Sequence, residues 1–442
     1  MKITRVDTVP VSIPINAERA IKGGRGVHAV SPFLLIKMHT DEGVTGLGEV
    51  SCTPGWSGED QVTAAHFIDD LLAPLLVGEN PLEIERLTIR LQRGLAGNPF
   101  TKSGLEMALW DILGKAAGLP VYRLLGGPVR AVVPTKFSVS GREPDRAAEI
   151  AAWAVAQGFR AMKVKVGIDP DEDVARVRAV RAAVGPDVRL GVDANGGWSP
   201  RVAIQTVRRL SEYGIAFAEQ PVPPLDVAWL ADVRRQVQVP VMADESVYTP
   251  QDAMAVVRAE AADVLSVYVG KGGGVGPARK IAAVAEAAGL TCTVGSNLEL
   301  GVASAAMIHL AMATPGIGAE EFPCDILGPF FYEDDILAAP LPITAGEARP
   351  LERPGLGVEL DADKVEHYRV GRLRKARIQL AVRSSSRPTF TVPPSNRRWR
   401  GRLPMRSRAA SPAFPALFML RGAACDMGTH EYGWFGLRKQ VF

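Results

Sequence analysis

The sequence has few of the residues that build disulfide scaffolds or histidine-ligated metal centres. Its 442 residues include four cysteines and six histidines. No cysteines stand at CxxC spacing, and no histidines stand at HxxxH or HxH spacing. The pattern therefore excludes a disulfide framework and a CxxC metal site, and it argues against a His-ligated zinc site. The cysteines are Cys52, Cys292, Cys324 and Cys425.

Long apolar runs are also missing. No run approaches 18 apolar residues, so we expect no membrane-spanning segment. The opening segment, MKITRVDTVPVSIPI, carries charges and prolines and lacks a small-residue cleavage site, so we expect no signal peptide. With 47% apolar and 22% charged residues, the composition is that of an ordinary globular protein, for which we expect a cytoplasmic location.

Acidic residues are scarce only near the end of the chain. Residues 371–442 hold 15 Lys and Arg but two Asp and Glu, which leaves 36 basic and 46 acidic residues elsewhere, a balance of −10. Because Arg, Ser and Pro dominate this segment without a helical or strand period, we interpret it as a basic tail without regular structure. The alternative is an arm that binds polyanions, with Trp399 stacking on a base. We do not expect nucleic acid to be the partner.

The N-terminal region, 1–127, is predicted to form an α+β domain. Apolar and polar residues alternate in Ile3–Ile13 and Phe33–Lys37, with Thr45–Glu49 following a turn, which indicates a small antiparallel meander. A long loop, Asn16–Pro32, connects its first strands. Helical patterns follow at Gln61–Leu76, Pro81–Leu95 and Ser103–Ala117.

From residue 128 to 344 the sequence pattern changes, and short apolar segments typical of strands alternate with helical patterns. Eight such units favour a closed (β/α)8, TIM-like barrel. An open doubly wound sheet is the alternative, but no GxGxxG motif opens a helix after the first strand. The predicted strands are Val132–Ser138, Ala161–Val166, Leu190–Asp193, Ala216–Glu219, Val239–Ala243, Val264–Val269, Thr291–Val294 and Gly316–Glu320.

Three of these strands end in a carboxylate. Asp193, Glu219 and Asp244 are evenly spaced along the chain, one βα unit apart, so we expect them at one level on adjacent strands. Neighbouring carboxylates repel one another unless a cation neutralises them. Oxygen ligands with room for water or substrate suit Mg²⁺, with Mn²⁺ as a substitute.

Two lysines share the interior face of the second strand, since Lys163 and Lys165 alternate with apolar residues. A divalent cation and a lysine together can abstract a proton next to a substrate carboxylate and stabilise the resulting enediolate. Lys165 is the candidate base, and Lys163 would help neutralise the substrate carboxylate. Taken singly, Asp193 or Asp244 could instead be a helix N-cap, and the two lysines could lie on a half-exposed surface. A metal-free barrel aldolase with a Schiff-base lysine is the alternative from another class.

The chain resembles the enolase superfamily, in particular its muconate-lactonizing (muconate cycloisomerase) subgroup. The resemblance covers about residues 1–370 and rests on several motifs taken together. They are GLEMALWDILGKAAGLPVYRLLGG at 104–127, the KVK pair, DANGGW, EQP, ADES, a GG turn at 273–274 and SNLELG at 296–301.

The resemblance implies a capping domain, formed by the N-terminal region and the chain end at 345–370, over the barrel. It implies Mg²⁺ on Asp193, Glu219 and Asp244, with Lys165 as acid and base. Glu299 would support the site, and Asn195 and Glu245 would assist the ligands. It also suggests a dimer or octamer.

Two positions differ from what related members carry. Tyr268 stands where most members carry a lysine opposite Lys165, and Asn297 stands where mandelate-racemase-like members carry a histidine. Lys271, slightly further along the chain, is expected to point elsewhere unless it swings in. With one base, cycloisomerisation or syn dehydration is easier than racemisation or epimerisation, which remains the alternative. Tyr268 could act as an acid, or could only line the pocket.

The substrate is expected to be a small carboxylic acid. Arg19, Lys22, Arg25 and His28 lie in the long loop, and Trp56 lies in a second loop. Cations beside an aromatic ring suit an acidic substrate, and Arg25, His28, Trp56, Lys271 and Asn297 are the candidate contacts. The glycine cluster at 270–276 could cradle a phosphate, but a tight turn into a helix explains it better.

Overall fold

A parallel β-sheet forms the centre of the computed structural model, which describes residues 1–24 and 26–371. Seven strands follow the order β13-β12-β11-β10-β9-β8-β7, so each strand lies beside its neighbour in the chain. Their side chains are almost all buried; most are apolar, and buried polar residues such as Lys163, Asp193 and Glu219 lie among them. The strands are β7 (Phe137–Val139), β8 (Ala161–Lys165), β9 (Arg189–Asp193), β10 (Ile215–Glu219), β11 (Val241–Ala243), β12 (Val264–Val267) and β13 (Thr291–Val294).

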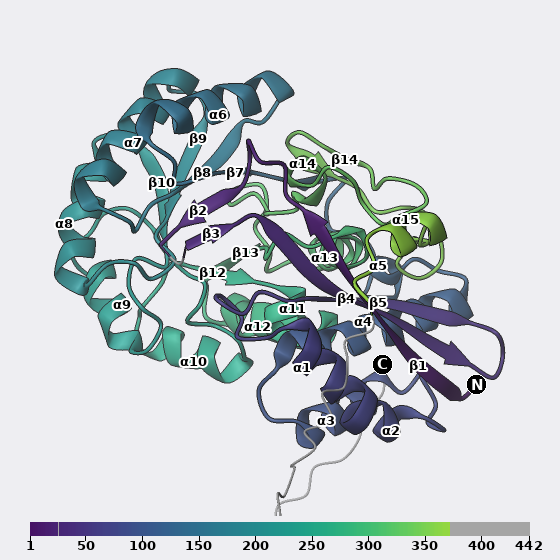
Figure 1. Ribbon diagram of the computed structural model, residues 1–442. Helices are drawn as coiled ribbons and strands as arrows, with labels where there is room; N and C mark the ends of the chain where they lie inside the picture. Colours follow the sequence, from purple (N-terminus) through teal and green to yellow (C-terminus); the bar gives the residue numbers. More distant parts are fainter. Residues whose placement is uncertain (25, 372–442) are drawn as a thin grey trace, which may run out of the picture. The chain divides into compact units, whose positions relative to one another are not determined.

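Helices follow the strands and lie outside the sheet (Figure 1). Several begin with proline, which lacks the amide hydrogen that the first helical turn leaves unpaired. Capping side chains add to this signal: Asp169 accepts from the amides of Asp171 and Glu172. These helices are α6 (Pro144–Gln157), α7 (Pro170–Val184), α8 (Pro200–Ser211), α9 (Val227–Arg234), α10 (Pro250–Arg258), α11 (Val269–Gly272), α12 (Val275–Ala287) and α13 (Gly301–Ala313).

The predicted strand at Gly316–Glu320 is wrong in detail. Residues 316–325 connect the two edges of the sheet through isolated bridges, Cys292 with Ile317 and Thr135 with Cys324. The amide of Lys136 donates to the carbonyl of Cys324, and the amide of Asp325 donates to the carbonyl of Val294. The ring is therefore closed as predicted, but an irregular segment takes the place of a regular eighth strand.

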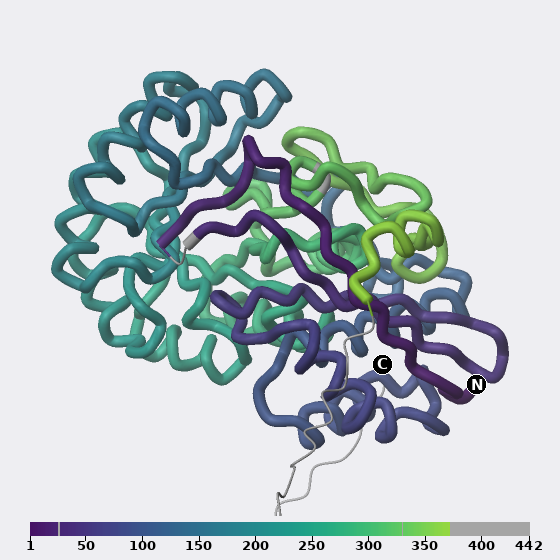
Figure 2. The backbone as a smooth tube through the Cα atoms, in the orientation of Figure 1, coloured from purple at the N-terminus to yellow at the C-terminus, as the bar shows by residue number. Residues whose placement is uncertain are grey.

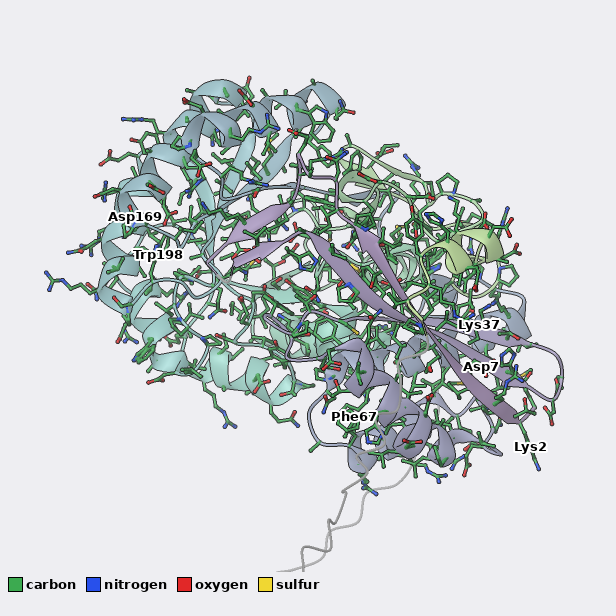
Figure 3. All side chains as sticks on the ribbon, in the orientation of Figure 1. Lys2, Asp7, Lys37, Phe67, Asp169 and Trp198 are labelled. Atoms are coloured by element: carbon green, nitrogen blue, oxygen red, sulfur yellow. The ribbon has the colours of Figure 1, made fainter. Side chains whose placement is uncertain are left out.

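A second, antiparallel sheet holds β1 (Ile3–Pro14), β4 (Val30–Thr40) and β5 (Thr45–Ser51). Asp7 and Lys37, labelled in Figure 3, are partners across β1 and β4. Helices pack beside this sheet, and the segment Gln61–Leu76 forms continuous helix with a π-helical middle. These elements are α1 (Gln61–His66), η1 (Phe67–Leu72), α2 (Ala73–Leu76), α3 (Ile84–Gly94), α4 (Pro99–Ala117) and α5 (Val121–Leu124).

The loop predicted at Asn16–Pro32 is in part a hairpin. Strands β2 (Ile21–Gly23) and β3 (Gly26–His28) pair within it, and β4 begins already at Val30. Figure 2 shows this hairpin extending from the antiparallel sheet across the parallel one. The amide of Lys22 donates to Oγ of Ser140, which follows β7, at 2.8 Å. The hairpin is therefore held at the ends of the barrel strands.

Buried carboxylates join the N-terminal domain to the barrel. Glu49 of β5 accepts from the amides of Leu300 and Ala303 at 2.8 and 3.0 Å, at the start of α13. Glu106 of α4 accepts from the amides of Val275 and Gly276 at the start of α12, both at 2.8 Å. Burial raises the pKa of Glu49 to about 8 and that of Glu106 to about 7. Carboxylates at helix N-termini meet unpaired amide donors, so these contacts fix the domain above the strand ends.

The end of the described chain lies beside both regions. Short elements complete it: β6 (Val133–Pro134), α14 (Gly328–Phe331), β14 (Ile343–Thr344), β15 (Glu347–Ala348) and α15 (Ala362–His367). β15 pairs with β6, and the amide of Val370 donates to the carbonyl of Pro10 in β1. Apart from Gly371, the predicted basic tail lies outside the described residues. Within 1–24 and 26–371, no helix is both long and apolar enough to cross a bilayer.

Candidate active site

The ends of adjacent parallel strands bring the predicted acids and lysines together. In the sheet register, Lys165 at the end of β8 pairs with Asp193, and Asp193 pairs with Glu219. Asp244 directly follows β11. All three carboxylates are buried, with at most 1% of each residue exposed. The register therefore places Lys165, Asp193 and Glu219 at one level, and Asp244 follows on the next strand, two residues after Met242, the partner of Glu219.

The two lysines of β8 bind these carboxylates differently. Nζ of Lys163 lies 2.8 Å from Oε1 of Glu219 and 3.2 Å from Oδ2 of Asp193. Burial opposes the charge on Lys163, but the surrounding carboxylates raise its pKa well above the usual value. Nζ of Lys165 donates to Oδ2 of Asp193 at 2.6 Å and to Oδ1 of Asn195 at 2.9 Å. Its side chain is 13% exposed, against 5% for Lys163, so Lys165 is the more accessible amine.

The donor set suits a hard divalent cation. Burial and the negative charges of Asp193 and Asp244 raise the pKa of Glu219 to about 8. Burial acts on Asp193 in the same direction, but Lys165 and Lys163 lower its pKa far below the usual value. Oε2 of Glu219 is buried without a hydrogen-bond partner among the described residues. Crowded carboxylates with an unpaired oxygen are the environment that a bound Mg²⁺ or Mn²⁺ would stabilise.

The same oxygens are engaged by protein groups in this structure. Among the described residues, no group of three His, Cys, Asp or Glu side chains is already arranged to hold a metal ion. Lys163 contacts two of the three carboxylates, and Tyr268 and Lys271 contact the third, Asp244. A cation would therefore compete with these contacts when it binds.

Tyr268 and Lys271 both meet Asp244. The hydroxyl of Tyr268 donates to Oδ2 at 2.8 Å. Nζ of Lys271 lies 2.5 Å from Oδ1 and also donates to the carbonyls of Asp244 and Ser266, at 2.6 and 2.9 Å. Against the expectation, Lys271 therefore turns toward the site and binds Asp244, but it does not line the pocket. The glycine-rich turn forms the short helix α11, and Nζ of Lys271 lies over the Tyr268 ring, 4.3 Å from its centroid.

A pocket of about 360 Å³ opens above these groups. His28, Trp56, Tyr268 and Asn297 all line it, together with Lys163 and Lys165. Lys271 is not among its lining residues, and Arg25 lies outside the described residues. The rest of its lining is mainly apolar or uncharged: Ile21, Gly23, Val27, Val30, Pro32, Cys52, Thr53, Pro54, Gly55, Ser138, Asn195, Ser296, Leu298, Asp325 and Leu327.

Two of the predicted loop cations, Arg19 and Lys22, are not among the residues that line this pocket. Arg19 stacks over the ring of Trp153 at 4.9 Å, and Lys22 pairs with Glu143 at 3.6 Å. His28 lines the pocket, with Nε2 2.5 Å from Oγ of Ser31, and burial lowers its pKa. A neutral imidazole at the pocket wall does not provide the positive charge that the sequence predicted.

The predicted supporting residues hold the loops around the pocket. Glu299 accepts from Oγ of Ser296 at 2.6 Å and from the amide of Asn297 at 3.0 Å, and burial raises its pKa. Asn297 donates through Nδ2 to Oγ1 of Thr53 at 3.0 Å, which joins a barrel loop to a loop of the N-terminal domain. Glu299 therefore shapes the loop at 296–298 rather than facing the pocket.

Sequence reasoning missed Asp325 and Lys136. Oδ2 of Asp325 lies 3.0 Å from Nζ of Lys163 and 3.1 Å from Nζ of Lys136, and all three side chains are buried. Asp325 also lines the pocket. The sequence did carry a signal for Asp325. It is an acid inside the otherwise apolar run FPCDILGPFF, and it follows Glu299 by about the length of one βα unit.

Two family models match the chain. The model for the N-terminal domain of mandelate racemase / muconate lactonizing enzyme matches residues 6–126, and the model for the enolase C-terminal domain-like fold matches residues 145–364. N-succinyl-L-Arg/Lys racemase of Bacillus cereus is 34% identical over 371 residues, which cover 84% of this chain and 98% of that protein.

Solved structures of similar sequence have similar folds. Muconate lactonizing enzyme of Pseudomonas fluorescens, complexed with muconolactone, has a TM-score of 0.80 and 31% identity, over 84% of this chain and 99% of that one. Dipeptide epimerase of Enterococcus faecalis V583, complexed with Mg and the dipeptide L-Leu-L-Tyr, has a TM-score of 0.77 and 31% identity, over 81% of this chain and all of that one.

Proposed function

The chain belongs to the mandelate racemase / muconate lactonizing enzyme family of the enolase superfamily, and we propose that it is a one-base, metal-dependent isomerase of the cycloisomerase type. In this proposal Lys165 moves a proton to and from the carbon next to a substrate carboxylate. The observation that carries it is Tyr268, whose hydroxyl faces Asp244 where a two-base enzyme needs a second amine. Syn dehydration would use the same single base and is the related alternative.

Lys165 has the contacts that an acid and base of this kind needs. Asp193 and Asn195 hold its amine by hydrogen bonds of 2.6 and 2.9 Å at the pocket wall, which fixes the direction of proton transfer. Lys163 lies deeper, where its positive charge would offset the substrate carboxylate. A divalent cation on Asp193, Glu219 and Asp244 would supply further positive charge to stabilise the negative charge that develops as the proton leaves.

Neither neighbour of Asp244 is a suitable second base. Burial and the carboxylates of Asp244 and Glu219 raise the pKa of Tyr268 well above its usual value, so the phenol stays protonated. Lys271 directs its ammonium group to three oxygen acceptors and is not among the pocket-lining residues. Proton return to the opposite face of the substrate, which racemisation requires, therefore has no amine poised for it among the described residues.

The pocket walls favour a substrate whose remainder is uncharged. Apart from Lys163, Lys165 and Asp325, whose carboxylate is paired with Lys163, the lining is apolar or neutral, and burial lowers the pKa of His28. Transferring a second charged group into such surroundings would be costly unless it were paired. We therefore expect a small carboxylic acid with an apolar or neutral tail.

Racemase or epimerase activity is the second candidate, and the 34% identity with the Bacillus cereus racemase favours it.

Exchange in deuterium oxide with Mg²⁺ separates the two candidates, with muconolactone and N-succinyl-L-arginine as probes. One-base chemistry predicts Lys165-dependent deuterium incorporation with retained configuration, and Tyr268→Phe should keep it. Lys280→Ala, an exposed lysine paired with Glu85, is the control. Formation of the opposite enantiomer would support the racemase, and full exchange in Lys165→Ala would contradict both candidates.

A further inference from the structure

Trp56 connects the N-terminal domain to two parts of the candidate site. It follows β5, and its indole Nε1 donates to Oε1 of Glu245 at 3.2 Å. Its ring stacks on Tyr268 with a centroid separation of 5.5 Å and an interplanar angle of 16°. The edge of the Phe100 ring meets it at 5.9 Å and 84°. These contacts fix both the position and the orientation of the indole, so its N–H points in a defined direction.

The hydrogen bond to Glu245 continues toward Lys165. Oε1 of Glu245 also accepts from Nδ2 of Asn195 at 3.1 Å. Oδ1 of the same Asn195 side chain accepts from Nζ of Lys165 at 2.9 Å. Glu245 and Asn195 are buried, so water competes weakly for these bonds. An unbroken series of hydrogen bonds therefore runs from a loop of the N-terminal domain to the candidate base in β8.

We propose that Trp56 is a positioning residue for Lys165. Its indole N–H holds Glu245, Glu245 fixes the orientation of the Asn195 amide, and that amide directs the Lys165 amine. The proton-transfer group is then correctly oriented only while the loop that carries Trp56 is seated on the barrel. The kinetic consequence rests on the proposed role of Lys165, whereas the geometric consequence does not depend on it.

A second indole provides a matched comparison. Nε1 of Trp110 donates to Oε1 of Glu106 at 2.9 Å. Like the bond from Trp56 to Glu245, it joins an indole N–H to a glutamate oxygen. Glu106 continues to the backbone amides of Val275 and Gly276 at the start of α12, so this bond holds secondary structure together. Trp110 is therefore expected to support the fold without directing a group in the pocket.

The test compares Trp56→Phe with Trp110→Phe, since each keeps an aromatic ring and loses one N–H donor. Trp56→Phe is expected to lower kcat for Lys165-dependent deuterium exchange into muconolactone by about tenfold, because sub-ångström misplacement of a reacting group is costly. KM should stay within about twofold, since the ring still covers the pocket. Trp110→Phe should leave kcat unchanged.

Crystal structures of the wild-type protein and Trp56→Phe provide the readout that does not require activity. The proposal predicts that the Lys165 amine leaves Oδ1 of Asn195 in Trp56→Phe. An unmoved Lys165, or a raised KM with unchanged kcat, would overturn it and leave Trp56 as a cover for the pocket. If no Lys165-dependent exchange is found in the wild-type protein, the proposed function fails, and the crystal structures still decide the positioning role.

Discussion

The hydroxyl of Tyr268 donates a hydrogen bond to Oδ2 of Asp244, and Nζ of Lys271 binds the other oxygen of the same carboxylate. The carboxylate is therefore shared between a phenol and an ammonium group on one side of the pocket. Lys165 stands at the wall with its own partners, Asp193 and Asn195. This asymmetry distinguishes the chain from a site with two equivalent amines.

Replacing Tyr268 by lysine should add the missing second base. We expect Tyr268→Lys to raise racemisation of an N-succinyl amino acid by about 100-fold over wild type, within the usual range for a placed acid or base. Polarimetry with a chiral chromatography endpoint would measure it. Tyr213→Lys adds an amine at the end of α8, outside the pocket lining, and should have no effect. Equal racemisation by wild type would show that a second base is already present.

Magnesium should stabilise the folded protein through the three strand-end carboxylates. A cation at 100 times its Kd raises the free energy of unfolding by about 2.7 kcal/mol, because it binds only the folded state. We expect Mg²⁺ to raise the Tm of wild type, EDTA to reverse the shift, and Glu219→Gln to abolish it. Glu85→Gln, which removes an exposed carboxylate, is the control. A Tm shift of equal size in Glu219→Gln would contradict the assigned ligands.

Asp325 should contribute strongly to stability because it neutralises two buried lysines. Asp325→Asn leaves Lys163 and Lys136 without that carboxylate, and breaking a buried ion pair in this way costs about 3 to 5 kcal/mol. Glu320→Gln removes an exposed partner of Arg130 and should cost less than about 1 kcal/mol. Urea unfolding at constant m-value measures both. A loss for Asp325→Asn as small as the control would show that the lysines are compensated elsewhere.

Local sequence predicted the strand-end groups because their positions follow from chain spacing. Asp193, Glu219 and Asp244 repeat once per βα unit, and parallel strands bring such residues to one edge. Alternation likewise placed Lys163 and Lys165 on one face of β8. These features depend on period and register, which a sequence carries directly.

The remaining site residues depend on tertiary geometry. Asp325 lies in an irregular segment that closes the ring through isolated bridges. No regular strand ends at Asp325, so the sequence pattern did not mark it as a strand-end acid. Lys271 turns inward because residues 269–272 form a short helix rather than an open turn. Lys22 pairs with Glu143 because the loop that carries it folds into a hairpin. Each outcome was decided by packing between segments far apart in the chain.

A positive charge at the mouth of the pocket should change substrate preference. Val30 lines the pocket and is 55% exposed, so Val30→Lys would place an ammonium group there without burying it. We expect it to strengthen binding of N-succinylglycine relative to the neutral-tailed N-butanoylglycine by about 1 kcal/mol, the value of a good exposed ion pair. Val62→Lys, a 53% exposed valine of α1, is the control. Calorimetry with Mg²⁺ measures both ligands, and wild-type preference for the dicarboxylate would contradict the neutral pocket.

Stability should fall in mild acid because His309 is buried in its neutral form. Nδ1 of His309 accepts from the amide of Tyr122 at 3.3 Å, and Nε2 lies 3.2 Å from the carbonyl of Leu356. Burial lowers the pKa of His309 from 6.5 to about 4. Between these values the unfolded chain binds the proton and the folded chain does not, so stability decreases as the pH falls. Burying His309 in its neutral form therefore makes the free energy of unfolding about 3 kcal/mol larger above pH 6.5 than below pH 4.

Comparing variants isolates this group from the other titrating side chains. His309→Gln keeps an acceptor and a donor but cannot be protonated, so its unfolding free energy should fall by about 3 kcal/mol less than that of wild type between pH 6.5 and pH 4. His66→Gln changes an exposed histidine and should follow the wild-type curve. Urea unfolding across this pH range provides the measurement. If the free energies of unfolding of wild type and His309→Gln changed equally with pH, His309 would have the same pKa in the folded and unfolded chain. That result would contradict its burial beside α5 and the loop at Leu356.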